Sequence, residues 1–198
     1  MSRYPIRCAT AADLDAVLTL RREAEQWLAE NDIRQWTPDY DDYAVGVLTD
    51  WVDSGAAWVV EDAGMIVGTA SVHRLPDLDF WGWADPMDRI DALYLGKMIV
   101  ARSHAGRGVG SAVMNWASQR AAAAGLTWLR IDVRRDNRKL HAYYEARGFQ
   151  HLRTWHAAGR RTESGWLAQR RAGTVTDTPA QVVEACPAGH HQPEATGG

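Results

Sequence analysis

The fold is decided by residues 97–111, which read Lys97-Met98-Ile99-Val100-Ala101-Arg102-Ser103-His104-Ala105-Gly106-Arg107-Gly108-Val109-Gly110-Ser111. The apolar residues up to Val100 predict the end of a buried strand, and the glycines predict a turn that opens a helix. The first amides of a helix lack intrahelical acceptors and lie at the positive end of its dipole. This segment therefore suits a phosphate or pyrophosphate, with Arg107 adding positive charge.

Two other phosphate-binding patterns do not match this turn. A GxGxxG pattern read from Gly108 ends in Val113, and GxxxxGK[ST] occurs nowhere in the chain. NAD and ATP are therefore not the first expectation. A turn that needs glycine only for its shape is the alternative.

The elements around the turn predict an α/β fold with a mixed sheet. Thr10 and Asp13 have the spacing of a capping box at the start of a helix. The β-α-β-α-β order after residue 92 favours a sheet that contains parallel strands. Hydrophobic periodicity and turn residues predict helices over 11–30, 41–52, 108–124 and 137–147, and strands over 56–61, 65–74, 92–100, 128–133, 149–156 and 165–169.

Composition predicts one domain followed by a tail. The 198 residues are 46% hydrophobic and 24% charged, as in a single globular domain. From residue 172 onward the chain has no Phe, Trp or Tyr. We therefore expect a domain over residues 1–172 and a disordered tail over 173–198.

The sequence excludes several classes of protein. No apolar run approaches the roughly 20 residues of a membrane helix, and no signal-peptide run is found, so a cytoplasmic location without membrane contact is expected. Cys8 and Cys186 lack disulfide-scaffold or zinc spacing, so free thiols and no metal are expected. A net charge of −3 and Lys/Arg runs of at most two residues disfavour nucleic acid.

The charge is divided unevenly along the chain. Residues 1–100 hold 8 basic and 18 acidic residues, whereas residues 101–198 hold 14 and 7. The basic half suits a polyanionic ligand and the acidic half a cationic one. Charges that merely solvate the surface are the alternative.

Two segments together resemble the GNAT superfamily of N-acetyltransferases. Ala105–Gly110 resembles the family's Q/R-x-x-G-x-G/A turn, with Ala105 where the family favours Gln or Arg. Ile131–Asn137 followed by Tyr143–Phe149 resembles the family's strand, Asn and Y-x-x-x-G-F sequence. The resemblance covers residues 4–171. It implies an acetyl-CoA-dependent enzyme whose central sheet is mostly antiparallel, is splayed between two parallel strands, and is flanked by about four helices.

The resemblance also implies which residues bind acetyl-CoA. Backbone amides of Met98 and Val100 are expected at the pantetheine and thioester, and residues 105–111 at the pyrophosphate. Asn137 and Tyr144 are seven residues apart and are expected on one helix face toward the coenzyme. The full expected coenzyme site comprises Met98, Ile99, Val100, Ala105, Gly106, Arg107, Gly108, Val109, Gly110, Ser111 and Asn137.

Acid and base roles follow from the reaction. Tyr144 occupies the family's general-acid position, with helix packing as the alternative. An alkylammonium with a pKa of about 10.4 must lose a proton before it attacks. The strand position that is acidic in some relatives is Gly96 here. Asp132 and Asp91 are then the candidate bases, ahead of His73, and an ordinary salt-bridge or capping role is the alternative for both.

The acceptor is expected to lie against residues 31–43 and 75–89. Their acidic and aromatic side chains favour a small cationic amine, unless the aspartates solvate loops and the tryptophans fill core. A peptide or protein amine, or a non-catalytic acyl-CoA sensor, are the other hypotheses, and a homodimer is left open. Neither cysteine lies in a motif, so direct transfer is expected. The side chains concerned are Asp39, Asp41, Asp42, Asp77, Asp79, Asp85, Asp88, Trp36, Tyr40, Trp81 and Trp83.

Overall fold

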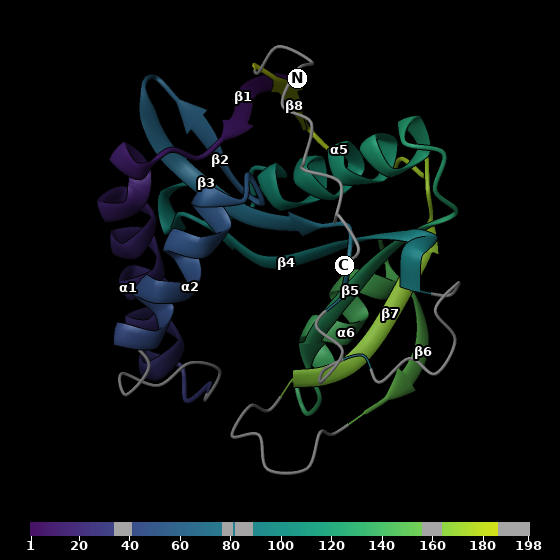
Figure 1. Ribbon diagram of the computed structural model, residues 1–198. Coiled ribbons are helices and arrows are strands. Elements are labelled where there is room, and N and C mark those ends of the chain that lie inside the picture. The colour runs from purple at the N-terminus through teal and green to yellow at the C-terminus, as the bar shows by residue number, and fades with distance from the viewer. Residues whose placement is uncertain (34–40, 77–80, 82–88, 156–163, 186–198) are drawn as a thin grey trace, which may run out of the picture. The chain divides into compact units, whose positions relative to one another are not determined.

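The chain forms a mixed α/β fold, which confirms the predicted fold class (Figure 1). The computed structural model describes residues 1–33, 41–76, 81, 89–155 and 164–185. The strands hydrogen-bond in the order β6-β7-β5-β4-β3-β2-β1-β8. Its strands are β1 (Ser2–Cys8), β2 (Ala57–Asp62), β3 (Met65–His73), β4 (Ala92–Val100), β5 (Trp128–Arg134), β6 (Gln150–Thr154), β7 (Ser164–Arg171) and β8 (Ala180–Glu184). The α-helices of the described residues are α1 (Leu14–Glu30), α2 (Asp41–Asp53), α5 (Val109–Ala123) and α6 (Arg138–Glu145), in line with the four expected.

The backbone divides into two compact units, each of which contains part of the sheet. The first unit comprises Met1–Ser71, Met98–Val109 and a C-terminal piece that begins at Ala180. The second comprises Val72–Lys97 and Gly110–Pro179.

In the first unit, β1 and β3 both pair with β2 in antiparallel fashion. Ala63 and Gly64 connect β2 to β3 with φ values of 49° and 78°, as in a two-residue hairpin turn. The start of the first helix is also as predicted, because the Thr10 amide donates to Asp13 Oδ2 at 2.7 Å. Arg7 of β1 donates to both oxygens of the same carboxylate, at 2.7 and 2.9 Å. These bonds join the start of the helical segment to the sheet.

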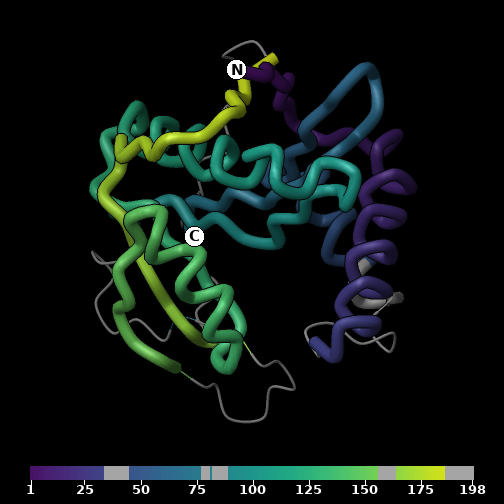
Figure 2. The backbone as a smooth tube through the Cα atoms, turned by 180° about the vertical axis from the view of Figure 1, so that it is seen from behind, coloured from purple at the N-terminus to yellow at the C-terminus, as the bar shows by residue number. Residues whose placement is uncertain are grey.

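The core of the first unit lies between this sheet and the helices α1 and α2. Val17 of α1 and Val59 of β2 are buried in one cluster, against which Trp51 of α2 packs. The two helices lie side by side in Figures 1 and 2. Burial of one apolar face on each helix is what the helical spacing of apolar residues predicted.

In the second unit, β5 pairs with β4 and β7. The parallel ladder of β4 with β5 runs from Ala92↔Trp128 to Leu95↔Ile131 and ends there, although both strands continue. Lys97, two residues later, has a φ of 45°, which is unusual for a residue with a side chain. β4 therefore changes course where it leaves the ladder.

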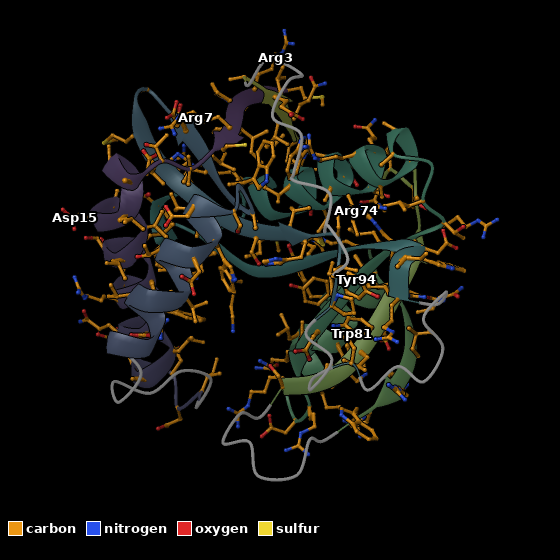
Figure 3. The ribbon with its side chains drawn as sticks, viewed as in Figure 1. Arg3, Arg7, Asp15, Arg74, Trp81 and Tyr94 are labelled. Carbon is orange, nitrogen blue, oxygen red and sulfur yellow. The ribbon has the colours of Figure 1, made fainter. Side chains whose placement is uncertain are left out.

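Trp81 belongs to the core of the second unit. It is 4% exposed, and its ring lies edge-on to Tyr94 with centroids 4.9 Å apart (Figure 3). The hypothesis that Trp81 lines the acceptor site is therefore replaced by its alternative, core packing. Large aromatic side chains contribute most when their area is buried in this way.

The C-terminal segment departs from the prediction of a disordered tail. β8 pairs in parallel with β1, in register from Ser2↔Ala180 to Ile6↔Glu184, and Figure 2 shows it beside the first strand. Ala180 and Val182 are 1% and 8% exposed. The folded chain thus continues past the boundary expected at residue 172, whereas residues 186–198 lie outside the described part. The strand was missed because five residues without aromatic side chains carry little periodic signal.

Removal of β8 is expected to destabilise the protein. A chain that ends at Gly173 should lose about 2 kcal/mol in free energy of unfolding relative to a chain that ends at Ala185, because Val182 leaves a buried site. Urea unfolding of the two chains measures the difference. Equal midpoints and slopes would contradict the docked strand.

Candidate functional site

The end of β4 directs its peptide groups alternately to its two edges. In the first unit, the Ala101 amide donates to the Val67 carbonyl of β3 at 2.9 Å. The Ile99 carbonyl oxygen lies 3.2 Å from where a Cβ on Gly68 would stand. Since successive residues of a strand point their peptide groups to opposite edges, those of Met98 and Val100 point away from β3. Met98 and Val100 can thus offer backbone groups to a ligand, whereas Ile99 faces β3.

The turn after β4 has the left-handed conformation that its glycines allow. Gly106 and Gly108 have φ values of 77° and 82°, and a Cβ on Gly106 would meet nothing within 4 Å. Glycine is thus needed at residue 106 for conformation rather than for space. Ala105, Gly106 and Arg107 are exposed. The turn leads directly into α5, whose first amides, at residues 109–111, have no acceptor within the helix.

His104 anchors the segment just before this turn. The side chain is 7% exposed. Its Nε2 lies 2.9 Å from Asp62 Oδ2, and its Nδ1 lies 2.9 Å from Ser103 Oγ. Asp62 ends β2, so the contact joins the turn to the β2–β3 hairpin. Sequence reasoning missed this residue, because no local pattern connects partners 42 positions apart.

Asn137 is the N-cap of α6. Its Oδ1 accepts a hydrogen bond from the Leu140 amide at 3.0 Å, and α6 begins at the next residue. Asn137 therefore precedes the helix, which begins one residue later than the predicted start at residue 137. A cap residue has a non-helical backbone, here with φ −91° and ψ 81°. Within the described part of the chain, the amide nitrogen of Asn137 forms no hydrogen bond and is available to a ligand.

Tyr144 combines a buried ring with an unbonded hydroxyl. It is 8% exposed, and its ring makes edge contacts with Tyr143 and Phe149, at centroid distances of 5.3 and 5.6 Å. Burial raises the pKa of Tyr144 well above its ordinary value. Among the described residues its hydroxyl has no hydrogen-bond partner. The group is thus protonated at neutral pH and can donate.

Each predicted carboxylate base accepts a backbone hydrogen bond. Asp91 Oδ1 accepts from the Thr127 amide at 2.9 Å, and the hydrogen bonds of the Thr127 side chain and amide lower the pKa of Asp91. Asp132 Oδ1 accepts from the Gly165 amide at 2.8 Å. Gly165 has a φ of 130° and is the extra residue where the β5–β7 register shifts. Asp132 thus satisfies the amide of a bulge.

His73 ends β3 and is also a candidate base. It is partly buried, and burial lowers the pKa of its imidazole. A neutral imidazole at neutral pH is able to accept a proton.

The predicted acceptor segments are largely outside the described residues. Residues 34–40, 77–80 and 82–88 are not described, nor are the side chains of residues 41–44. In the described ranges, no group of three or more His, Cys, Asp or Glu side chains is placed to hold a metal ion. No helix in these ranges is long and apolar enough to cross a membrane.

These features are typical of an α/β enzyme that binds a phosphorylated ligand where a glycine turn opens a helix. Residues 21–149 match the model of the acetyltransferase (GNAT) family, and the chain belongs to that family. It is therefore an acetyl-CoA-dependent acetyltransferase, as the two motifs predicted.

Known proteins agree with this assignment. The uncharacterized N-acetyltransferase YesJ of Bacillus subtilis (strain 168) is 24% identical over 147 residues, which cover 73% of this chain and 80% of the relative. A GNAT-family acetyltransferase from Listeria monocytogenes 4b F2365 has a similar fold, with a TM-score of 0.68, 22% identity, and coverage of 85% of this chain and 94% of that chain. The PaiA N-acetyltransferase from Thermoplasma acidophilum, solved with coenzyme A, matches with a TM-score of 0.64, 14% identity, and coverage of 86% and 99%.

Amide substitutions separate the structural and catalytic roles of the two carboxylates. Asp91→Asn and Asp132→Asn retain an oxygen acceptor, so each is expected to keep the stability of the parent chain, whereas Asp→Ala should cost about 1 kcal/mol. Thermal unfolding and turnover are measured together. A stable Asn variant with turnover reduced a hundredfold would identify that carboxylate as the base, and unchanged turnover would remove it from the reaction.

Proposed function

We propose that the protein transfers an acetyl group from acetyl-CoA directly to the primary amine of a small cationic acceptor. The observation that carries the proposal is Tyr144, because its ring is buried while its hydroxyl has no hydrogen-bond partner in the described part of the chain. A hydroxyl of this kind suits protonation of a leaving thiolate. The sequence-based expectation of a cytoplasmic location is part of the same proposal.

Acetyl-CoA supplies an activated thioester, and the chain's own groups bind it. The amides at the start of α5 and the exposed Arg107 would hold the pyrophosphate. The outward-facing peptide groups of Met98 and Val100 would bind the pantetheine, and one amide would polarise the thioester carbonyl. The free amide nitrogen of Asn137 is a further donor.

The transfer takes two protons from the nitrogen and gives one to the sulfur. The ammonium first loses a proton to a base, for which Asp132, Asp91 and His73 are the candidates. The neutral nitrogen then attacks the carbonyl carbon, the C–N bond forms, the nitrogen loses its second proton to water, and the C–S bond breaks. The sulfur takes the Tyr144 proton and leaves as a thiol. Among the candidate bases, His73 has the advantage of a neutral form at pH 7, whereas the lowered pKa of Asp91 makes its carboxylate a weak base.

The negative charge of the N-terminal half of the chain supports a cationic acceptor. The acidic excess of residues 1–100 and the aspartate-rich segments that border the expected acceptor side favour a cation. A peptide amine or a sensor without turnover are the competing hypotheses. They differ in their outcomes, because a peptide acetyltransferase turns over peptides only, and a sensor binds coenzyme A without releasing thiol.

The proposal is tested by thiol release from acetyl-CoA with a panel of polyamines, aminoglycosides, amino acids and peptides. Turnover is expected with a small cationic amine of this panel and not with the peptides. Gly108→Val should weaken coenzyme A binding more than tenfold in calorimetry, because a β-branched residue strains a φ of 82°. Binding without turnover across the panel would favour the sensor, and unchanged binding by the Gly108 variant would refute the phosphate turn.

Tyr144→Phe tests the proton donor. The variant keeps the buried ring and loses only the hydroxyl, so kcat is expected to fall at least thirtyfold while the Kd for coenzyme A changes less than threefold. Steady-state kinetics and calorimetry give the two values. A parallel loss of both would show that the hydroxyl binds the coenzyme rather than donating a proton.

A further inference from the structure

Arg147 joins two helices within the second unit. Its Nε donates to Ser111 Oγ in the first turn of α5 at 2.7 Å. Its Nη1 donates to the Tyr143 carbonyl of α6 at 2.7 Å, and its Cζ lies 3.5 Å from the centre of the Tyr143 ring. The guanidinium therefore holds the end of the helix that carries Tyr144 against the start of α5.

A second arginine supports this junction from the sheet. Arg170 of β7 is 1% exposed; it donates to the Arg147 carbonyl at 3.1 Å and to the Met114 carbonyl of α5. Burial lowers the pKa of Arg170 to about 10, so it remains charged at neutral pH. Within the described residues, neither Arg147 nor Arg170 forms an ion pair with a carboxylate. The junction thus carries positive charge that the described chain does not neutralise.

This charge acts on the neighbouring Tyr144. The cation of Arg147 opposes the effect of burial on the pKa of Tyr144. When Tyr144 gives up its proton, negative charge develops on the phenolic oxygen. A nearby cation stabilises that charge more effectively in a buried site than in water.

We propose that Arg147 is a positioning residue for the acetyl transfer, holding the Tyr144 helix on the first turn of α5 and favouring the departure of the Tyr144 proton. The role rests on the proposed function. In the step it assists, the Tyr144 O–H bond breaks and an S–H bond forms on the sulfur that leaves the acetyl carbon. The phenolate then regains a proton from water.

The motif does not specify this residue. Arg147 stands at a variable position of Y-x-x-x-G-F, and Ser111 lies 36 residues earlier. The Arg147 side chain supplies both a positive charge and hydrogen bonds. Different variants are therefore needed to measure the effect of each. Arg147→Gln removes the charge and keeps an amide donor, and Arg147→Lys keeps the charge. Arg138→Gln is the matched control, because Arg138 is exposed at the opposite end of α6.

The kinetic test uses acetyl-CoA and the amine that the panel identifies. Arg147→Gln is expected to lower kcat about tenfold or more, with the KM for acetyl-CoA changed less than threefold. Arg147→Lys should recover at least a third of the lost kcat, and Arg138→Gln should match the parent chain. Ser111→Ala, which keeps the cation but loses its anchor, should lower kcat by a smaller factor. An unchanged kcat in Arg147→Gln overturns the proposal.

A double-mutant cycle with Tyr144→Phe shows whether Arg147 acts through the tyrosine. The effect of Arg147→Gln on kcat should shrink to less than twofold in the Tyr144→Phe background. Equal effects of Arg147→Gln on kcat in the parent chain and in the Tyr144→Phe variant would show that Arg147 does not act through Tyr144. If Arg147→Gln does not fold, as judged by thermal unfolding, the same cycle is run with Arg147→Lys and Ser111→Ala. A parent chain without turnover rejects the proposed function and this role with it, whereas an active parent with independent effects rejects only the role of Arg147.

Discussion

The short parallel ladder between β4 and β5 is the constraint on which the site depends. It ends at Leu95 and Ile131, although both strands continue. Backbone N–H and C=O groups that leave a ladder must find other partners, in the protein, in water or in a ligand. Beyond the left-handed Lys97, the Ala101 amide bonds to the Val67 carbonyl of β3, and peptide groups that alternate with it along the strand point to the other edge. The glycine turn and α5 begin where this strand ends. The path of β4 therefore determines where the groups of the expected coenzyme site lie.

The second unit shows why polar groups are kept inside a hydrophobic fold. A buried guanidinium without a carboxylate is costly, and Arg170 reduces that cost by donating to the carbonyls of Met114 and Arg147 and to Asn115 Oδ1. Asp132 similarly satisfies the bulge amide of Gly165. Because hydrogen bonds have a preferred direction, these bonds fix the orientation of α6 and β7, in addition to the stabilisation that comes from buried surface area. A hydrophobic core of equal volume would hold the same elements with less control over the orientation of Tyr144.

Local sequence signals predicted most elements and missed those that depend on distant partners. The strand over residues 92–100 and the capping of the first helix were predicted correctly, because apolar runs and cap spacing act within a few residues. β8 was missed, since its pairing with β1 joins the two ends of the chain. Trp81 was ambiguous between core and acceptor site, because composition does not say which way an aromatic side chain faces.

By itself, the sequence determined the family and the class of chemistry, because the glycine turn and the Asn–Tyr segment are short motifs whose conformation and ligand chemistry are local. Tertiary structure alone decided which groups act together. The contacts of Arg147 with Ser111, of His104 with Asp62, and of Asp91 with Thr127 join residues 36 to 42 positions apart. Such pairs follow from strand register and helix packing, which depend on the burial of many side chains throughout the fold. The local sequence around either partner therefore does not indicate the contact.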